Sequence, residues 1–361
     1  MMGQIISRIR GFGLPRLIIF AFFLLLFLLA RIYGMDTPQL MSDVLRRWGM
    51  YGILVLAMLP GIQCGIGPNF GVTIGIVGGL LGALISIELR SYGFFLLFAG
   101  SPTLDAMASV SVAILLALFF SGLFGFLYGL LLNRVKGSEM TVSTYIGYSI
   151  VALFNILWLI LPFRSGTSIW PLAGEGLRNT ISLADDFSNV FNRFLGFSIG
   201  NMFIPTGLLL IFFLACFSIW LFSKSRLGAM MGAAGASPLY AKAAGIHVDR
   251  MRIIGTTIST ALGGVGIICY AQSFGFLQLY NAPQTMGFAC AASVLIGGAS
   301  IKKAKIFNVL LGTFLFHGIL AAALPVANAI LPEGQLSEIL RIIITNGIIL
   351  YALSKAKGEA L

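Results

Sequence analysis

Side chains able to do covalent or acid–base chemistry are scarce in this sequence. Its 361 residues include 12 Asp and Glu and only 2 His. Glu88 and Asp105 lie at the ends of apolar runs, and His317 is the only histidine inside one. The chain has no GxxxxGK[ST] phosphate loop and no HExxH zinc motif. These absences argue against an enzyme, and against an ion-coupled pump, which needs ionisable groups within its apolar segments.

Uncharged polar side chains, in contrast, recur where Pro, Gly or Asn interrupts an apolar run. Together with phenylalanine rings, they suit a neutral polar solute that has an apolar or ring face. We expect a solute path lined by Gln63, Asn69, Thr73, Asn155, Phe276, Asn281 and Gln284. Asn69 and Gln284 are the strongest candidates for polar contacts with the solute.

The four cysteines show no sign of a metal site or of a disulfide framework. Cys64, Cys216, Cys269 and Cys290 all fall inside apolar segments, without the spacing of metal ligands. We expect them to be small buried side chains.

The composition identifies lipid as the solvent of the chain. Hydrophobic residues make up 58%, charged residues 10%, and the mean hydropathy is +0.98, whereas a soluble domain carries about 25% charged residues. A run of about 20 apolar residues crosses a bilayer. We expect an all-α, polytopic membrane protein with about ten spans, at 17–33, 50–66, 68–88, 106–132, 139–162, 203–222, 251–272, 284–300, 306–327 and 336–354.

The net charge of +11 is distributed by side of the membrane. If both termini are cytoplasmic, the inner segments hold all eight lysines, and the outer segments hold nine of the 12 acids. This asymmetry follows the positive-inside rule, so the basic character reflects orientation and not nucleic-acid binding. It predicts that Lys136, Lys224 and Lys302 are cytoplasmic and that Asp185 is external. Arg31, Arg46 and Arg47 are exceptions in the first outer segment.

Residues 67–83 carry a row of glycines, Gly67, Gly71, Gly75 and Gly79, at every fourth position. Rows of small residues let membrane helices approach closely, and Gly122, Gly125 and Gly129 indicate a second such face. Residues 50–88 must cross twice with no room for a loop. We therefore expect a broken, tightly turned element between residues 60 and 69, its backbone facing protein or water.

Residues 280–298, YNAPQTMGFACAASVLIGG, weakly repeat this pattern of a break followed by a small-residue helix. The two copies lie five spans apart and so run in opposite directions. Interrupted segments in inverted halves point to a transport site.

The inner segment SRLGAMMGAAGASPLYAKAAGIHVDRMR (225–252) predicts a short cytoplasmic helix. Proline is favoured at a helix start and glycine just after a helix end. The predicted segment consists of Pro238, Leu239, Tyr240, Ala241, Lys242, Ala243, Ala244 and Gly245. Leu239 and Tyr240 would anchor it to a partner.

The same segment resembles the permease subunits of ABC importers of the ribose-type and branched-chain amino-acid-type family. The residues that match the family pattern are Arg226, Leu227, Gly228, Ala233, Gly235, Ala241, Ala244, Gly245, Ile246 and Val248. The likeness continues through GFACAASVLIGGAS (287–300) and the basic turn of Lys302, Lys303 and Lys305.

The resemblance implies a ten-span permease of the bacterial cytoplasmic membrane. It would pair with a second permease, identical or related, and work with cytoplasmic ATP-binding subunits and an extracytoplasmic substrate-binding protein. ATP and Mg²⁺ would bind to the partner subunit, so this chain would hold no cofactor or metal and would not itself be an enzyme. Residues 238–245 would form the helix that couples to the ATPase.

These expectations divide a single transmembrane domain, residues 1–361, into six parts. They are a first span (17–33), a half-repeat (50–162), an outer loop (163–202), a linking span (203–222), a coupling segment (224–249) and a second half-repeat (251–354).

The solute expected from the uncharged path is sugar- or nucleoside-like. A branched-chain amino acid or a riboflavin-like vitamin is the alternative within the family. An ion-coupled secondary transporter and a membrane-bound enzyme are the alternatives outside it.

Overall fold

The computed structural model describes residues 14–95, 101–161, 163, 177, 179–330, 339, 342–343 and 346–350. Most of these residues are helical. The helices are α2 (Leu14–Ile32), α3 (Thr37–Leu56), α4 (Met58–Gln63), α5 (Val72–Ser91), α6 (Pro102–Leu132), α7 (Glu139–Ile160), α8 (Val190–Arg193), α9 (Thr206–Lys224), α10 (Arg226–Ala236), α11 (Pro238–Ala243), α12 (Val248–Phe274), α13 (Asn281–Ile296) and α14 (Ile306–Ile330). The strands are β1 (Thr180–Ser182), β2 (Phe197–Ile199), β3 (Met202–Ile204) and β4 (Phe276–Gln278).

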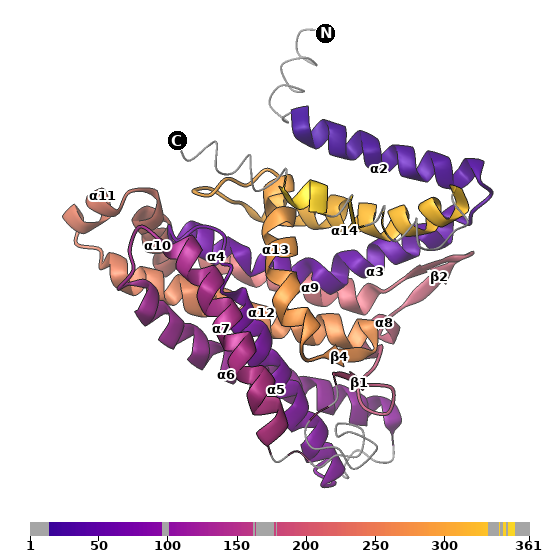
Figure 1. Cartoon of the computed structure of the whole chain (residues 1–361), viewed down its shortest axis with the longest axis horizontal. Helices are drawn as coiled ribbons and strands as arrows, with labels where there is room; N and C mark the ends of the chain where they lie inside the picture. The colour runs from indigo at the N-terminus through magenta and orange to yellow at the C-terminus, as the bar shows by residue number, and fades with distance from the viewer. Residues whose placement is uncertain are drawn as a thin grey trace.

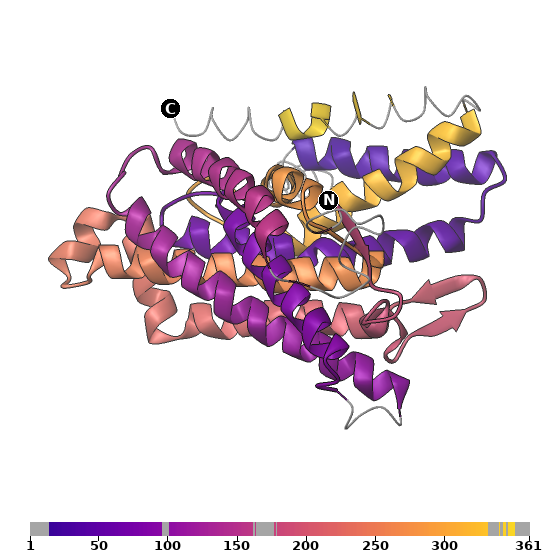
Figure 2. The same cartoon turned by 60° about the horizontal axis from the view of Figure 1, so that its bottom comes forward.

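Helix α12 lies at the centre of the packing. It contacts α3, α4, α5 and α6, and small or hydroxyl-bearing residues such as Ser259, Thr260, Gly263 and Gly264 are buried along it. Figures 1 and 2 show α3, α9, α12 and α14 running side by side, with α5, α6 and α7 crossing them obliquely. Helices α10 and α11 lie at one end and the β2–β3 hairpin at the other.

Six helices are long and apolar enough to cross a membrane: α5, α6, α7, α9, α12 and α14. They make the chain a multi-pass membrane protein. Among the other expected spans, α3 carries three charged residues and α13 has only 16 residues. The span expected at 336–354 lies largely outside the described residues. The number of ten spans, the sidedness of the termini and the two half-repeats therefore remain predictions.

Helix α3 begins 13 residues before the expected start at residue 50, so Arg46 and Arg47 belong to a helix and not to a loop. The helix start has a local cause, because the Asp36 carboxylate accepts a hydrogen bond from the backbone N–H of Gln39 and Pro38 lies in the first turn. The expected loop relied on the charges alone. In the structure Arg46 and Arg47 are half-buried on α3, and Arg46 bonds to Ser273 of α12.

The expected break is present between residues 57 and 71. The α3–α4 element ends at Gln63, and a buried loop then leads to α5. Gly65 and Gly67 adopt left-handed backbone conformations, with φ of 83° and 93°, which only glycine adopts at low cost. The loop is mostly buried, and even at the exposed Gly65 a Cβ would lie 2.9 Å from the Cα of Gly235.

The glycine row does not form one helical face, contrary to expectation. Gly67 is in the loop and Gly71 only caps α5, so just Gly75 and Gly79 present a helical surface. Both face α12, and a Cβ on Gly75 would lie 2.0 Å from the carbonyl oxygen of Thr260. The structure also shows a second close contact that the sequence did not predict, in which Gly78 and Gly82 face α6.

The all-α expectation misses four short strands. Strand β1 pairs with β4, with Ile181 opposite Leu277, and β2 pairs with β3. Part of the expected outer loop at 163–202 is thus tied to the break that precedes α13. A pairing between segments so far apart in sequence has no local signature. The four cysteines are free and buried.

Substitution of two glycines should show whether a glycine matters because a neighbouring helix packs against it, or only because it is a small residue in a helix. We expect Gly75→Ala to destabilise the protein by about 1–3 kcal/mol, because the new methyl group would overlap the α12 backbone. Gly122→Ala is the matched control on α6, since no atom lies within 4 Å of a Cβ at that position. Unfolding in detergent measures both. Equal losses of stability would contradict the packing of α5 against α12.

Candidate functional site

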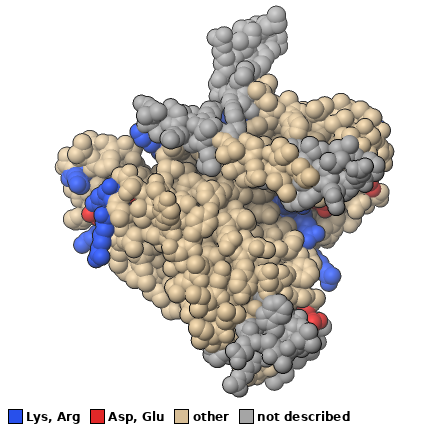
Figure 3. Space-filling view, viewed as in Figure 1, with Lys and Arg blue, Asp and Glu red and all other residues tan. Residues whose placement is uncertain are grey.

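Helix α11 projects at the end of the molecule where basic side chains gather (Figures 1 and 3). Ser237 caps it, accepting a hydrogen bond from the N–H of Tyr240 at 3.4 Å, and Pro238 occupies the first turn. Gly245 adopts a φ of 77° and turns the chain toward α12. The helix ends at Ala243, slightly earlier than expected, with Ala244 as its cap.

The two faces of α11 have different environments. Ala241 is fully buried and packs in a cluster that includes Met231 and Val248. Leu239 and Tyr240 are 83% and 71% exposed. Lys242, Ala243 and Ala244 are also exposed. The helix is therefore held by its own chain through Ala241 and presents a leucine and a tyrosine outward.

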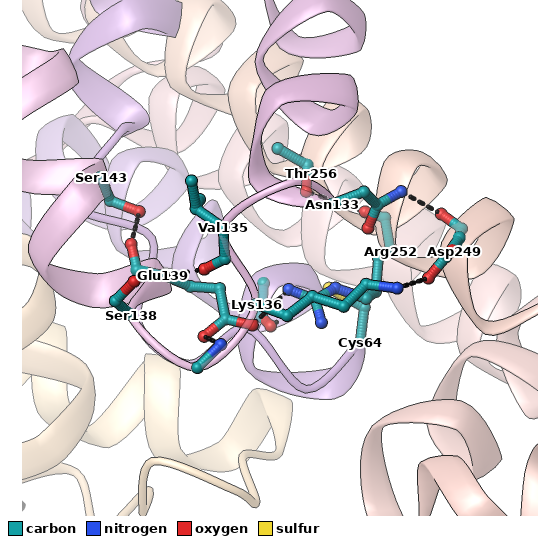
Figure 4. Close-up of polar contacts among 12 residues, drawn as sticks. Cys64, Asn133, Val135, Lys136, Ser138, Glu139, Ser143, Asp249, Arg252 and Thr256 are labelled. Carbon is teal, nitrogen blue, oxygen red and sulfur yellow. Dashed lines mark hydrogen bonds and ion pairs between the residues drawn. The ribbon is translucent and has the colours of Figure 1, made fainter.

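Two ion pairs connect the start of α12 to the turn between α6 and α7 (Figure 4). Lys136 Nζ lies 2.6 Å from Asp249 Oδ1, in a pair that is about half exposed. Arg252 Nη2 donates to Glu139 Oε1, and these side chains are only 11% and 15% exposed. Because α12 follows α11 directly, these contacts join the projecting helix to α6 and α7.

A buried chain of hydrogen bonds continues from Glu139 to the broken element. Ser143 donates to the Glu139 carbonyl oxygen. The Tyr128 hydroxyl lies 2.6 Å from Ser143 Oγ and 3.2 Å from Asn69 Oδ1. Asn69 Nδ2 then donates to Ser259 Oγ at 2.8 Å, and Ser259 donates to the carbonyl oxygen of Ala57 at 2.6 Å, where α3 ends.

These bonds give Asn69 a structural role, while its expected contact with the solute stays a prediction. Its amide is 1% exposed, and both of its polar atoms have partners within the protein. An asparagine amide offers two donors and two acceptor sites, and these bonds use one donor and one acceptor of Asn69 to hold the break in position. Sequence reasoning missed Tyr128, Ser143 and Ser259, because single hydroxyls in apolar helices carry no spacing signal.

The segments that follow the two breaks are in contact, as they must be if both breaks line one solute path. The Thr73 hydroxyl donates to the Pro283 carbonyl oxygen at 3.1 Å, joining α5 to α13. Thr73 and Gln284 line one crevice between α5, α7 and α13, together with Phe70, Tyr148 and Phe288. Its volume is ≈ 10 Å³, about that of one water molecule. In this conformation, the crevice is closed to any solute.

The other expected path residues are scattered. Phe276 and Asn281 are exposed beside the second break, in β4 and at the start of α13. Gln63 lines a separate hollow of ≈ 440 Å³ with Lys302, Lys303 and Lys305. Asn155 lies on α7, and its Oδ1 is buried without a hydrogen-bond partner among the described residues. The structure thus brings together only Thr73 and Gln284 from the predicted set.

A cluster of charges lies beside the loop after β1. Arg90 Nη2 lies 2.6 Å from Asp105 Oδ2, and Arg90 Nη1 lies 3.5 Å from Asp186 Oδ1. Burial raises the pKa of Asp186 to about 6, although the positive charge of Arg90 opposes the shift. Within the described ranges, no group of His, Cys, Asp or Glu could hold a metal ion.

Comparison with known proteins identifies the class. Residues 40–352 match the family described as "Branched-chain amino acid transport system / permease component", and the chain belongs to this family. The chain is therefore a permease component. It is also similar to the nucleoside ABC transporter permease protein NupB of Lactococcus lactis subsp. cremoris (strain MG1363), with 22% identity over 216 residues. That similarity covers 58% of this chain and 57% of the relative. No solved structure matches the chain.

The Arg252–Glu139 pair should be energetically coupled. Replacing either partner alone leaves the other charge buried and unpaired, which we expect to cost about 3 kcal/mol. Arg252→Gln combined with Glu139→Gln should therefore cost less than the sum of the two single changes. The half-exposed Lys136–Asp249 pair is the control, with an expected coupling of about 0–1 kcal/mol. A double-mutant cycle from unfolding measurements checks both pairs, and equal couplings would refute the prediction.

Asp186 should give the stability a pH dependence. Its folded-state pKa of about 6 exceeds the usual value near 4, so the folded protein binds this proton more tightly than the unfolded chain. The free energy of unfolding should then fall as pH rises from about 4 to about 6. Asp186→Asn should remove that fall, whereas the control Asp185→Asn should retain most of it, because burial contributes more to the shift than the charge of Asp185 does. Thermal unfolding across this pH range distinguishes the two outcomes.

Proposed function

We propose that the chain is the permease subunit of an ATP-driven, binding-protein-dependent importer of the bacterial cytoplasmic membrane, and that its solute is nucleoside-like. The observation that carries this proposal is the exposed Leu239–Tyr240 pair on α11. Large apolar side chains on a short helix at the basic end of a membrane protein need a partner to cover them. Family membership makes an ATP-binding subunit the expected partner.

The proposed coupling is mechanical. Ala241 fixes α11 to its own chain, so a partner that moves Leu239 and Tyr240 moves the start of α12 as well. The Arg252–Glu139 pair carries the displacement to α7. The buried hydrogen bonds from Ser143 through Asn69 carry it to the break at residues 57–71. ATP and Mg²⁺ would act on the partner, and this chain would convert the resulting displacement into opening of the path.

The remaining partners follow from the same proposal. A second permease, the same or a related chain, would complete the path. A substrate-binding protein would deliver the solute at the outer face. With the projecting α11 end in the cytoplasm, the loop containing Asp185 would face outward.

The choice of solute is supported by the similarity to a permease whose name specifies nucleosides. The family description, which names branched-chain amino acids, makes these the second candidate. Uptake of labelled uridine or leucine into cells that express the chain with its partner subunits decides between them.

Truncation of the exposed pair should uncouple transport. We expect Leu239→Ala with Tyr240→Ala to weaken association with the ATP-binding subunit by about 2 kcal/mol, roughly 30-fold. Uptake should be lost while the permease remains folded in the membrane. Leu115→Ala on α6 is the control, because that side chain is 65% exposed far from α11. Co-purification and uptake assays test this, and unchanged values in the double variant would refute the coupling role of α11.

A further inference from the structure

Helix α3 carries three charged residues beside a pocket, of which Arg46 and Arg47 are half-buried and Asp43 is exposed. Asp43, Arg46 and Arg47 line a pocket of ≈ 380 Å³ bounded by α3, α12 and α14. We call this cavity the α3 pocket. A few polar or charged groups that converge on a pocket are the usual means by which a ligand is oriented. The sequence had indicated an outer loop here and a path without charge.

Only one of the two arginines is engaged by the protein. Arg46 donates to the Ser273 carbonyl oxygen, and its Nε lies 3.3 Å from Ser273 Oγ. Asp43 and Arg47 form no hydrogen bond or ion pair with any residue that the structure describes. They lie four residues apart and therefore on one face of α3. An acid and a base, neither of them paired, thus line the same pocket.

Aromatic rings from α3 and α12 also line the pocket and lead out of it. Tyr51 and Tyr270 have ring centroids 5.2 Å apart, and Tyr270 stacks on Phe274 at 5.4 Å. Phe274 in turn contacts Phe276 at 5.9 Å. Phe276 belongs to β4, immediately before the break that precedes α13. The row of rings therefore connects the α3 pocket to the second break.

We infer that the α3 pocket binds the imported solute, and that its chemistry selects a nucleoside. This inference rests on the proposed function and assigns it a site. A planar base would stack on the ring of Phe274, which is 40% exposed and is backed by Tyr270. Arg47 would donate hydrogen bonds to carbonyl oxygens of the base, and Asp43 would accept them from ribose hydroxyls. The volume lies within the range of small-molecule sites.

Among the candidate solutes, the wall of the pocket favours one with a ring. A branched-chain amino acid could also pair its carboxylate with Arg47 and its ammonium group with Asp43. Three aromatic side chains would then face an aliphatic group and gain no stacking. Leucine is therefore the competitor that the experiment must exclude.

Saturation-transfer difference NMR of the whole chain in lipid nanodiscs tests the site, with uridine as the probe. The base protons H5 and H6 should receive more saturation than the ribose protons, because the base stacks on the ring of Phe274. We expect Arg47→Gln to weaken uridine binding about tenfold, and Phe274→Leu to abolish the preference for base protons. Arg31→Gln is the matched loss of one arginine, on the exposed end of α2, and should bind uridine as the wild type does.

The outcomes separate the site from the proposed function. Uridine binding and uptake that are unchanged in both pocket variants would overturn the α3 pocket and leave the nucleoside importer intact. Displacement of uridine by leucine at an equal concentration would overturn the selection for a ring. Uptake of leucine but not uridine by the wild-type transporter would instead overturn the proposed function.

Discussion

The structure depends on one constraint, which is that backbone broken inside a membrane must find its hydrogen-bond partners in protein. Between residues 57 and 71 the helix stops, turns on Gly65 and Gly67, and starts again. Ser259 of α12 accepts from the Asn69 amide and donates to the carbonyl oxygen of Ala57. Helix α12 must therefore lie directly against the break, and its central place in the fold follows.

To lie against the break, α12 must approach α5 closely, and this close approach requires glycine on α5. The α12 backbone passes Gly75 so closely that even a methyl group would overlap it. The same proximity brings the start of α12 to the α6–α7 turn, where Arg252 meets Glu139. A rigid polar connection thus runs from the segment that follows α11 to the break. Lipid cannot replace these bonds, so the connection is costly to open and suits the transmission of a displacement.

The charged residues of α3 differ from this pattern, because not all of them have a hydrogen-bond partner in the part of the chain that the structure describes. Arg46 is satisfied by Ser273 at the end of α12, whereas Asp43 and Arg47 find no partner among the described residues. Two charges that line one pocket without a hydrogen bond or ion pair among the described residues indicate a role other than stability.

The sequence by itself determined the lipid environment, the position of most helices, the broken element and the short helix at residues 238–243, because hydropathy, proline and glycine act locally. Only the tertiary structure decided which face each residue presents. It separated Gly67 and Gly71 from the packing row, gave Asn69 hydrogen bonds to α6 and α12, and placed Arg47 beside a pocket. Those outcomes depend on residues about 190 positions away, such as Ser259 for Asn69, and no local pattern records which helix will supply the partner.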